Sequence, residues 1–358
     1  MPQRSPHLDA VLVIGPNWIG DAVMSTPALA NLRRELPKAT IDLLVPYTIA
    51  PLFEEHPDVD RVLSRDDRQP WPTRLARLLG LRQQQYGAVV LLPNSLRAAL
   101  YARLTGSPVR VGYATDGRGW LLTHPVAARD EGAPRHQVEA YLRVVGALGI
   151  PVVEQHPRLT PTVKAETAAE RLWDANGLRR EERVLGICPG AAFGPAKRWW
   201  PERFAALADR LIAEGGWRVV FFGSARESAL VEQIRALMAH DAVSFAGQDT
   251  LDGFVALAAR CAVMITNDSG SMHIASAVGT PVVSIFGPTD PRRTAPMSAA
   301  ATVLRRDLPC SPCFRTTCPY ADHPCMRLIE VDEVFRAVFE SQGIHQRTWP
   351  QATSLNGS

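Results

Sequence analysis

The sequence predicts an α/β protein made of two doubly wound units in tandem. The chain has 358 residues, which at roughly 150 residues per domain indicates two domains. Short apolar segments alternate with helical patterns, as in parallel sheets that are covered on both faces. The alternation stops at a proline-rich polar stretch over residues 154–162 and then begins again. We therefore expect one unit on each side of that stretch.

The individual elements follow from apolar runs and their turn residues. Compact apolar segments are expected to form strands at 8–14, 40–45, 86–92, 184–188, 217–222, 262–266 and 281–286. Amphipathic patterns are expected to form helices at 21–36, 201–214, 228–239, 269–278 and 331–340. The domains are placed at 1–165 and 166–330, followed by a helical segment, 331–346, and a disordered tail, 347–358.

Charge and hydropathy exclude several function classes. The formal net charge is +3, from 39 basic and 36 acidic side chains. This balance argues against a nucleic-acid-binding protein, which concentrates basic residues on one face. No segment approaches the ~20 apolar residues that span a bilayer, and the first residues lack the apolar core of a signal peptide. We expect a cytoplasmic protein that can still meet an anionic substrate or a membrane surface.

The turns after the strands are where ligands of open α/β sheets bind. The first such turn, residues 15–21, matches neither the GxGxxG nor the P-loop pattern. It places Asp21 at a helix start, where the helix dipole favours a carboxylate. An ionised Asp21 can take a proton from a substrate hydroxyl. Aspartate is also a preferred N-cap, and spacing alone favours that structural interpretation.

Residues 266–273 join a buried strand directly to a helix. Unpaired amides and the dipole at such a helix start form an anion site suited to a pyrophosphate. The amides expected to point outward are those of Ser269, Gly270, Ser271 and Met272. Asp268 is a poor phosphate ligand but can accept hydrogen bonds from sugar hydroxyls. The alternative is that Asn267 and Asp268 only cap the helix and that His273 is an ordinary buried histidine.

A glycine-rich loop over residues 189–201 lies on the same predicted rim. Gly190 allows backbone donors to approach a ligand, and Lys197 supplies a mobile cation for a phosphate. Gly223 and Ser224 follow the strand at 217–222, and we expect them to bind the same ligand as Gly190 and Lys197. Trp199 or Trp200 is expected to pack the loop.

Two further segments have unusual composition. Arginines alternate with Trp and Leu over residues 68–82, which fits a membrane-surface helix or, as the favoured interpretation, a helix with its apolar stripe on the sheet. The two interpretations are compatible if the basic face meets lipid headgroups. Four cysteines gather at Cys310, Cys313, Cys318 and Cys325. Four thiols can bind structural zinc, but this spacing is not that of a common zinc ribbon, so reduced thiols in a compact loop are favoured.

Five segments of the chain resemble motifs of the bacterial heptosyltransferases, and they occur in the same order. The matching segments are residues 15–29 (GPNWIGDAVMSTPAL), 92–97 (LPNSLR), 110–113 (RVGY), 189–199 (PGAAFGPAKRW) and 266–291 (TNDSGSMHIASAVGTPVVSIFGPTDP). The resemblance runs from about residue 10 to 340, and the cysteine-rich loop is similar to that of type II members. One departure is Trp200, where the family more often has proline; here the proline comes one place later.

The resemblance implies a GT-B fold, with two facing Rossmann-like domains and a C-terminal helix that returns to the first domain. It also implies inverting, metal-independent transfer of heptose from ADP-heptose to the first heptose of the Kdo-lipid A inner core. That reaction belongs to lipopolysaccharide biosynthesis at the cytoplasmic face of the Gram-negative inner membrane. No cofactor is then required, and the only metal to consider is zinc at the cysteines.

By motif, the resemblance also implies roles for single residues. Asp21 matches the general base, Lys197 the lysine facing the donor phosphates, and Asp268 the sugar-contacting acid. Residues Ser269 to His273 match the helix start that binds the pyrophosphate. Asp21 is expected to have a normal or lowered pKa and to take its proton late in the reaction. The residues expected to contact the acceptor are Asn17, Asn94, Ser95 and Arg97.

Other functions are weighed against this one. A type I or III heptosyltransferase or a sugar-nucleotide 2-epimerase would share the fold, and donor and acceptor profiling separates them. A non-catalytic protein would bind the nucleotide sugar without releasing ADP. A dehydrogenase is disfavoured because the glycine fingerprint and its acidic ribose partner are missing.

Overall fold

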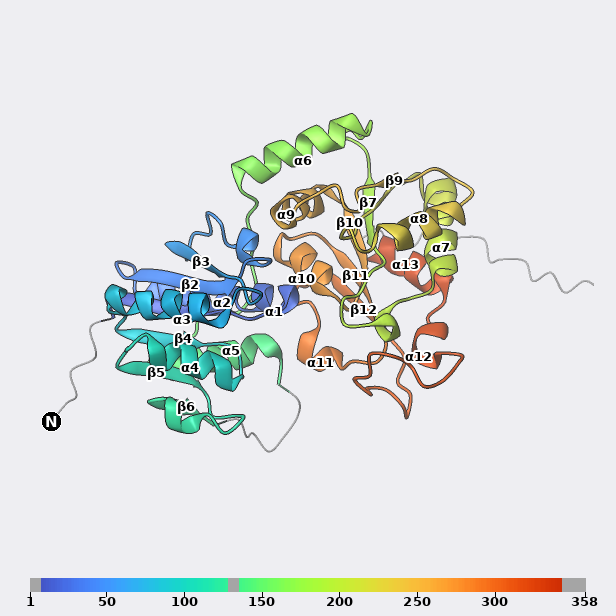
Figure 1. The fold of residues 1–358 in the computed structure, drawn as a ribbon. Coiled ribbons are helices and arrows are strands. Elements are labelled where there is room, and N and C mark those ends of the chain that lie inside the picture. The colour runs from blue at the N-terminus through green and yellow to red at the C-terminus, as the bar shows by residue number, and fades with distance from the viewer. Residues whose placement is uncertain (1–7, 128–134, 343–358) are drawn as a thin grey trace, which may run out of the picture.

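The computed structural model describes residues 8–127 and 135–342 of the chain (Figure 1). The expected tail at 347–358 lies outside these residues. They form two six-stranded parallel sheets, one in each lobe. The first contains, in spatial order, β3 (Arg61–Arg65), β2 (Thr40–Pro46), β1 (Ala10–Ile14), β4 (Ala88–Leu91), β5 (Val109–Tyr113) and β6 (His124–Val126).

The second sheet repeats the strand order of the first. It runs β12 (Ala301–Arg305), β11 (Val282–Phe286), β10 (Val263–Asn267), β7 (Val184–Cys188), β8 (Arg218–Phe221) and β9 (Val243–Ser244). In each domain, strand order therefore reverses beside the domain's own first strand, at β1/β4 and at β7/β10. The predicted pair of doubly wound units is confirmed, and the reversal points mark where ligands bind.

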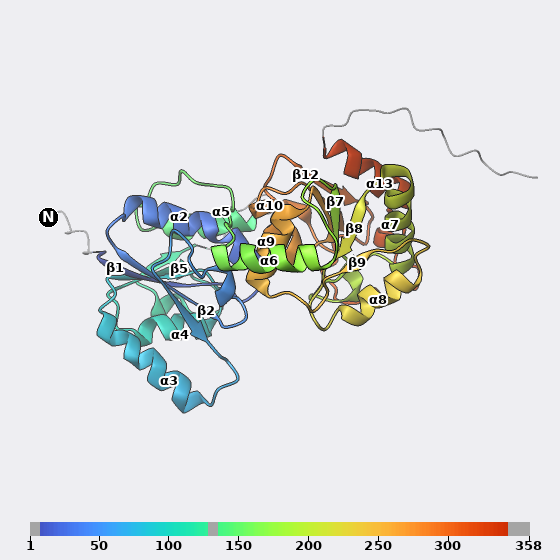
Figure 2. The same ribbon diagram turned by 90° about the horizontal axis from the view of Figure 1, so that it is seen from above.

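Helices cover both faces of the first sheet. One face carries α1 (Ile19–Met24), α2 (Thr26–Glu35) and α5 (Gln137–Gly146), and the other carries α3 (Trp71–Gly80) and α4 (Leu96–Leu104) (Figure 2). The shorter 3₁₀ turns are η1 (Ala50–Leu52), η2 (Leu81–Gln84) and η3 (Gly119–Leu121). The single helix expected over 21–36 is two helices that meet at Ser25. Pro27 lacks an amide, so it is tolerated only in the first turn of a new helix.

The connection between the domains lies close to its predicted place. Asn31 of α2 holds the first part, because its side chain bonds the amides of Val153 and Glu154 and the carbonyl of Glu154. The amide of Leu159 already bonds Ala277 of the second domain. The predicted boundary at 165/166 falls inside α6 (Val163–Ala175), so the domains divide before that helix.

The second domain contains the remaining helices. They are α7 (Pro201–Gly215), α8 (Ser228–Ala236), α9 (Leu251–Arg260), α10 (Gly270–Ala277), α11 (Pro291–Thr294), α12 (Pro324–Arg327), α13 (Val331–Glu340) and the 3₁₀ turn η4 (Pro195–Lys197). In Figures 1 and 2, α6 lies along α9 where the lobes meet. Within the described ranges, no helix has the length and apolar character to cross a bilayer.

The helix at the end of the described chain corrects one expectation. The segment 331–346 was predicted to return to the first domain, but α13 packs on α7 in the second domain (Figure 1). Val334, Phe335 and Val338 are buried in the second domain's core, and Gln342 bonds the carbonyl of Ala262. The apolar side of α13 is thus buried within the second domain. Residues 343–346 lie outside the described part.

Candidate functional site

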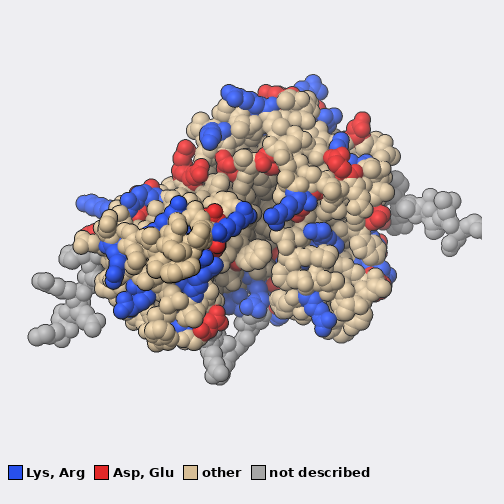
Figure 3. Space-filling model, viewed as in Figure 1, with Lys and Arg blue, Asp and Glu red and all other residues tan. Residues whose placement is uncertain are grey.

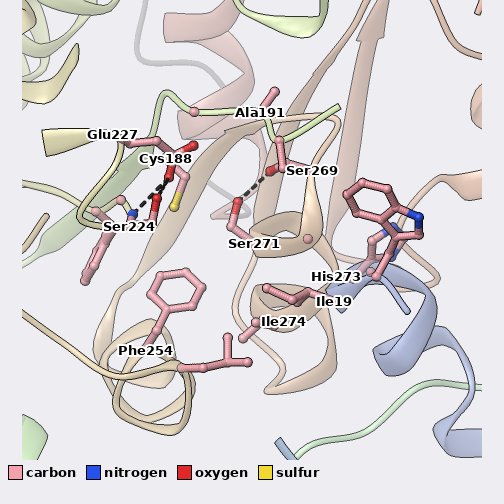
Figure 4. Close-up of a pocket in the computed structure, with 18 of the residues that line it drawn as sticks. Ile19, Cys188, Ala191, Ser224, Glu227, Phe254, Ser269, Ser271, His273 and Ile274 are labelled. Carbon is pink, nitrogen blue, oxygen red and sulfur yellow. Dashed lines mark hydrogen bonds between the residues drawn. The ribbon is translucent and has the colours of Figure 1, made fainter. Parts of the chain in front are cut away.

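A cavity of about 650 Å³ lies between the two domains at the carboxyl ends of both sheets (Figures 3 and 4). This volume suits a ligand of nucleotide-sugar size. The first domain contributes the turn and helix start at 18–21, with Met24 and Thr48. The second contributes the turns after β7, β8 and β10, so both predicted sets of residues meet in one space.

Two helix starts face each other across the domain boundary. A Cβ on Gly20 of α1 would lie 2.8 Å from His273 Cδ2 of α10, and one on Gly270 would lie 2.8 Å from Ile19 Cγ2. Only glycine permits such an approach without displacement of the neighbouring side chain. The amino-terminal ends of both helices therefore open into the cavity, where their dipoles favour negative charge.

Asp21 stands in the first turn of α1 and lines the cavity. It is not the N-cap, because that position is Trp18 and no side-chain cap bond is made there. Burial raises the pKa of Asp21, opposed by a hydrogen bond from the Tyr141 hydroxyl and by the charge of Lys197. The expectation of a normal or lowered pKa was wrong, because burial removes water from the carboxylate. A raised pKa makes Asp21 a stronger base.

Lys197 reaches the same cavity from the second domain. Its Nζ lies 2.5 Å from Asp268 Oδ2, and the side chains are only 12% and 5% exposed. The Thr289 hydroxyl donates to the same Asp268 oxygen, so this carboxylate holds Lys197 in place. Asn267 bonds the amide of Trp199 and the carbonyl of Pro189, which ties down both ends of the loop that carries Lys197. Asn267 is therefore a loop anchor rather than a helix cap.

Trp200, where the family pattern is interrupted, causes no distortion of this loop. Trp200 is the N-cap residue of α7, and Pro201 occupies the first turn, where a missing amide costs nothing. Trp199 is buried, its indole donates to the carbonyl of Ile329, and its ring meets Phe204 edge to face. The prediction that a tryptophan packs the loop is confirmed.

The start of α10 has the form of an anion site. Its N-cap, Ser269, makes no side-chain cap bond, and the hydroxyls of Ser269 and Ser271 lie 2.7 Å apart (Figure 4). Met272 does not line the cavity: its side chain is buried in the core and its amide donates to the Ser269 carbonyl. Burial lowers the pKa of His273 to about 4, so the imidazole lining the cavity is neutral at pH 7.

The far end of the cavity is apolar on one side and acidic on the other. Phe222, Leu251 and Phe254 form the apolar wall (Figure 4). The Glu227 carboxylate accepts bonds from the amide and hydroxyl of Ser224, at 2.9 and 2.8 Å. A Cβ on Gly190 would lie 1.7 Å from Glu227 Oε1, so a side chain there would have to displace the Glu227 carboxylate.

Sequence reasoning placed Gly190, Gly223 and Ser224 in this cavity but missed two acids. Glu227 follows Ser224 by one helical turn, and this spacing was the available signal. Asp249 also lines the cavity, and burial raises its pKa to about 7. No pattern in the sequence distinguishes Asp249 from an ordinary turn residue.

The four residues expected to contact the acceptor lie outside the cavity lining. Ser95 is the N-cap of α4, since its hydroxyl accepts from the Ala98 amide. The turn that carries Asn94 and Ser95 is pinned by Arg118, which is fully buried and donates to the carbonyls of Pro93 and Ser95. Arg118 lies too far along the chain for sequence spacing to have identified it.

Asn17 and Arg97 belong to one polar network on the rim. Asp67 pairs with Arg65, with Arg74 and, at 3.2 Å, with Arg97. Arg65 in turn donates to the Asn17 side chain. The guanidinium of Arg97 is 44% exposed, so the network presents basic groups beside the opening of the cavity.

The cysteine-rich segment packs against the loop of Lys197. Its thiols are free, and all four cysteines line a small cavity of about 190 Å³ with His323. In the described part of the chain, no three His, Cys, Asp or Glu side chains are placed to hold a metal. Reduced thiols stay the prediction here, with structural zinc as the disfavoured alternative. His323 Nε2 lies 2.9 Å from the carbonyl of Ala196, and the Ala196 amide donates to Thr316. The segment thus fixes the residue next to Lys197.

Known proteins share this sequence and architecture. The family model described as glycosyltransferase family 9 (heptosyltransferase) matches residues 73–323. Lipopolysaccharide heptosyltransferase 2 of Escherichia coli is 36% identical, over 82% of this chain and 87% of that protein. Lipopolysaccharide heptosyltransferase 1 of Pseudomonas aeruginosa is 29% identical, over 87% of each chain. The solved structure of E. coli ADP-heptose LPS heptosyltransferase II superposes with a TM-score of 0.79 at 31% identity, covering 93% of this chain and 98% of that one.

Proposed function

Because the chain belongs to glycosyltransferase family 9, the heptosyltransferases, we propose that it moves heptose from ADP-heptose to the first heptose of the Kdo-lipid A inner core. One observation carries the chemistry: Asp21 of one domain and Lys197 of the other line the same cavity, beside an open helix start. The higher identity to the type 2 relative than to the type 1 relative supports the second-heptose reaction.

The second domain is the proposed donor side. The pyrophosphate of ADP-heptose binds at the start of α10, where Ser269–Ser271 and the helix dipole offer positive potential. Lys197, held by Asp268, adds a full positive charge as the bond between the sugar and the phosphate breaks. In this scheme these groups stabilise the departing ADP without a metal ion, and full activity in a chelating buffer tests that.

The first domain is the proposed acceptor side. The acceptor hydroxyl attacks the anomeric carbon from the face opposite ADP, which inverts the configuration, and its proton passes to Asp21. The buried setting of Asp21 supports this role, because a carboxylate poorly solvated by water takes a proton more readily. The basic groups of Arg65, Arg74 and Arg97 around Asp67 support an acceptor side here, because guanidinium groups bind phosphates and sugar hydroxyls.

The acceptor is anchored in a lipid bilayer, so the enzyme works at a membrane surface. We place it at the cytoplasmic face of the inner membrane, bound peripherally. This placement rests on the chemistry of the proposed acceptor.

Incubation with ADP-heptose and two acceptors tests the function directly. One acceptor is Kdo-lipid A without heptose, and the other already carries one heptose; mass spectrometry follows the products. We expect one added heptose on the second acceptor only. Addition to the heptose-free acceptor would instead identify a type I enzyme. Binding of ADP-heptose without ADP release would identify a non-catalytic binding protein.

A further inference from the structure

The outer face of the first domain carries an acid-free segment. Residues 68–115 contain seven arginines and not one aspartate or glutamate. Asp67 and Asp116 border the segment, and Asp67 pairs with the arginines nearest the cavity, Arg74 and Arg97. Arg77 on α3 and Arg103 on α4 are exposed and form no ion pair with any described residue. The charge of this face is therefore basic and unneutralised.

The same face exposes large apolar side chains. Trp71, at the start of α3, is 72% exposed, and Trp120 of η3 is 76% exposed. Leu79 of α3 and Leu96 and Leu100 of α4 are also exposed. These elements adjoin, because α4 contacts both α3 and η3. A water-facing surface normally hides such side chains, and tryptophan prefers the boundary between water and lipid.

Basic and apolar residues on this face are placed together rather than scattered. Leu78 and the alanines of α4 bury the inner sides of both helices against the sheet, which leaves the opposite sides to solvent. Figure 3 shows this lobe from the side on which α3 and α4 lie: an uncharged surface bordered mostly by Lys and Arg side chains, with a few Asp and Glu side chains at its edge. Exposed tryptophans together with arginines that form no ion pair are typical of a protein surface that rests in the headgroup layer of a membrane.

We propose that this α3–α4 face, comprising Trp71, Arg77, Leu79, Leu96, Leu100, Arg103 and Trp120, docks the enzyme on an anionic lipid bilayer. The arginines bind lipid phosphates, and the two tryptophans enter the headgroup layer. The proposal rests on the proposed function, because it names the surface through which the enzyme meets a lipid-anchored acceptor.

The position of the face relative to the cavity fits this role. Helix α4 begins two residues after Asn94, at the carboxyl edge of the first sheet where Asp21 also lies. Arg97 belongs to the rim network, and Arg103 lies near the other end of the same helix. One helix therefore connects the docking face with the proposed acceptor entrance, so a headgroup sugar need not leave the membrane surface to reach Asp21.

Vesicle sedimentation with the full-length protein tests the docking face. The vesicles are phosphatidylcholine alone or with about 30% phosphatidylglycerol, a proportion that gives a negative surface potential. We expect binding only to the anionic vesicles. Arg77→Glu/Arg103→Glu should weaken it at least tenfold, and Trp71→Ala/Trp120→Ala several-fold. The matched control, Lys164→Glu/Arg171→Glu on α6, reverses two charges on another face and should leave binding unchanged.

Activity separates this proposal from the proposed function. On a water-soluble, deacylated acceptor, the Arg77→Glu/Arg103→Glu variant should turn over like wild type, which also shows that it folds. On acceptor embedded in vesicles, its turnover should fall with its binding. Equal vesicle binding by wild type, variant and control would overturn the docking face, as would salt-independent binding. If the wild-type protein transferred heptose to neither acceptor, the proposed function would instead be overturned.

Discussion

The two crevices of the molecule have the same strand order but different degrees of organisation. At the β7/β10 crevice, Asn267, Asp268, Thr289 and Lys197 bond one another or the surrounding loops, and little of this set is exposed. At the β1/β4 crevice, Asp21 lines the cavity while the other predicted residues lie on an exposed rim. This difference fits the proposed function, in which a small donor meets a large, lipid-linked acceptor.

The two crevices also differ in which groups are held in place before a ligand binds. The second domain holds its charged groups in place before any ligand arrives, so no free energy is lost in arranging them during the reaction. In the first domain, Asp21, the proposed base, lines the cavity, and Arg118 holds the turn of Asn94 and Ser95. The rim arginines Arg65, Arg74 and Arg97 pair with Asp67, and in the proposed scheme they exchange these bonds for the acceptor.

Asp21→Asn should have the largest effect. The amide keeps the size and hydrogen bonds of the side chain but cannot take a proton, so kcat should fall by about 10²–10⁴. ADP-heptose affinity, measured by calorimetry, should stay within a few-fold. In wild type, kcat/KM should rise with pH through the Asp21 pKa, which burial places above the ordinary value for aspartate. Near-wild-type turnover by the variant would show that another group is the base.

Lys197→Ala tests the second domain, whose charged groups are held in place before a ligand binds. Removal of the ammonium leaves Asp268 buried without its cation, so both donor binding and the stabilisation of departing ADP should weaken. We expect kcat to fall about 10²-fold, by analogy with loss of one transition-state donor, and KM for ADP-heptose to rise. Thr289→Val is the matched variant, because it removes only the second bond to Asp268. Unchanged kinetics for Lys197→Ala would remove the lysine from the site.

The sequence was sufficient for what depends on local pattern. Apolar runs and turn residues predicted three strands of the first sheet and four of the second, but not β3, β5, β6, β9 or β12. The strand-to-helix turns led to Asp21, Lys197 and the start of α10. It was insufficient wherever a residue acts through distant partners. Arg118 holds the turn at Asn94 from 24 positions away, and whether α13 packs on α7 or on the first domain depends on which apolar surface is nearest. Periodicity shows that a face is buried, not what buries it.

Arg97→Ala tests the exposed rim of the first domain and should have the smallest effect. Arg97 is half-exposed and shares Asp67 with Arg65 and Arg74, so its loss leaves neighbouring cations to compensate. An exposed pair of this kind contributes ~1 kcal/mol or less, which corresponds to about a fivefold rise in acceptor KM with kcat and donor KM unchanged. Arg171→Ala, an exposed arginine on α6, is the control. Steady-state kinetics with acceptor varied at saturating ADP-heptose measures the change. A loss in kcat as large as that of Asp21→Asn would mean that the rim is as tightly organised as the donor crevice, and the contrast between the two sides would fail.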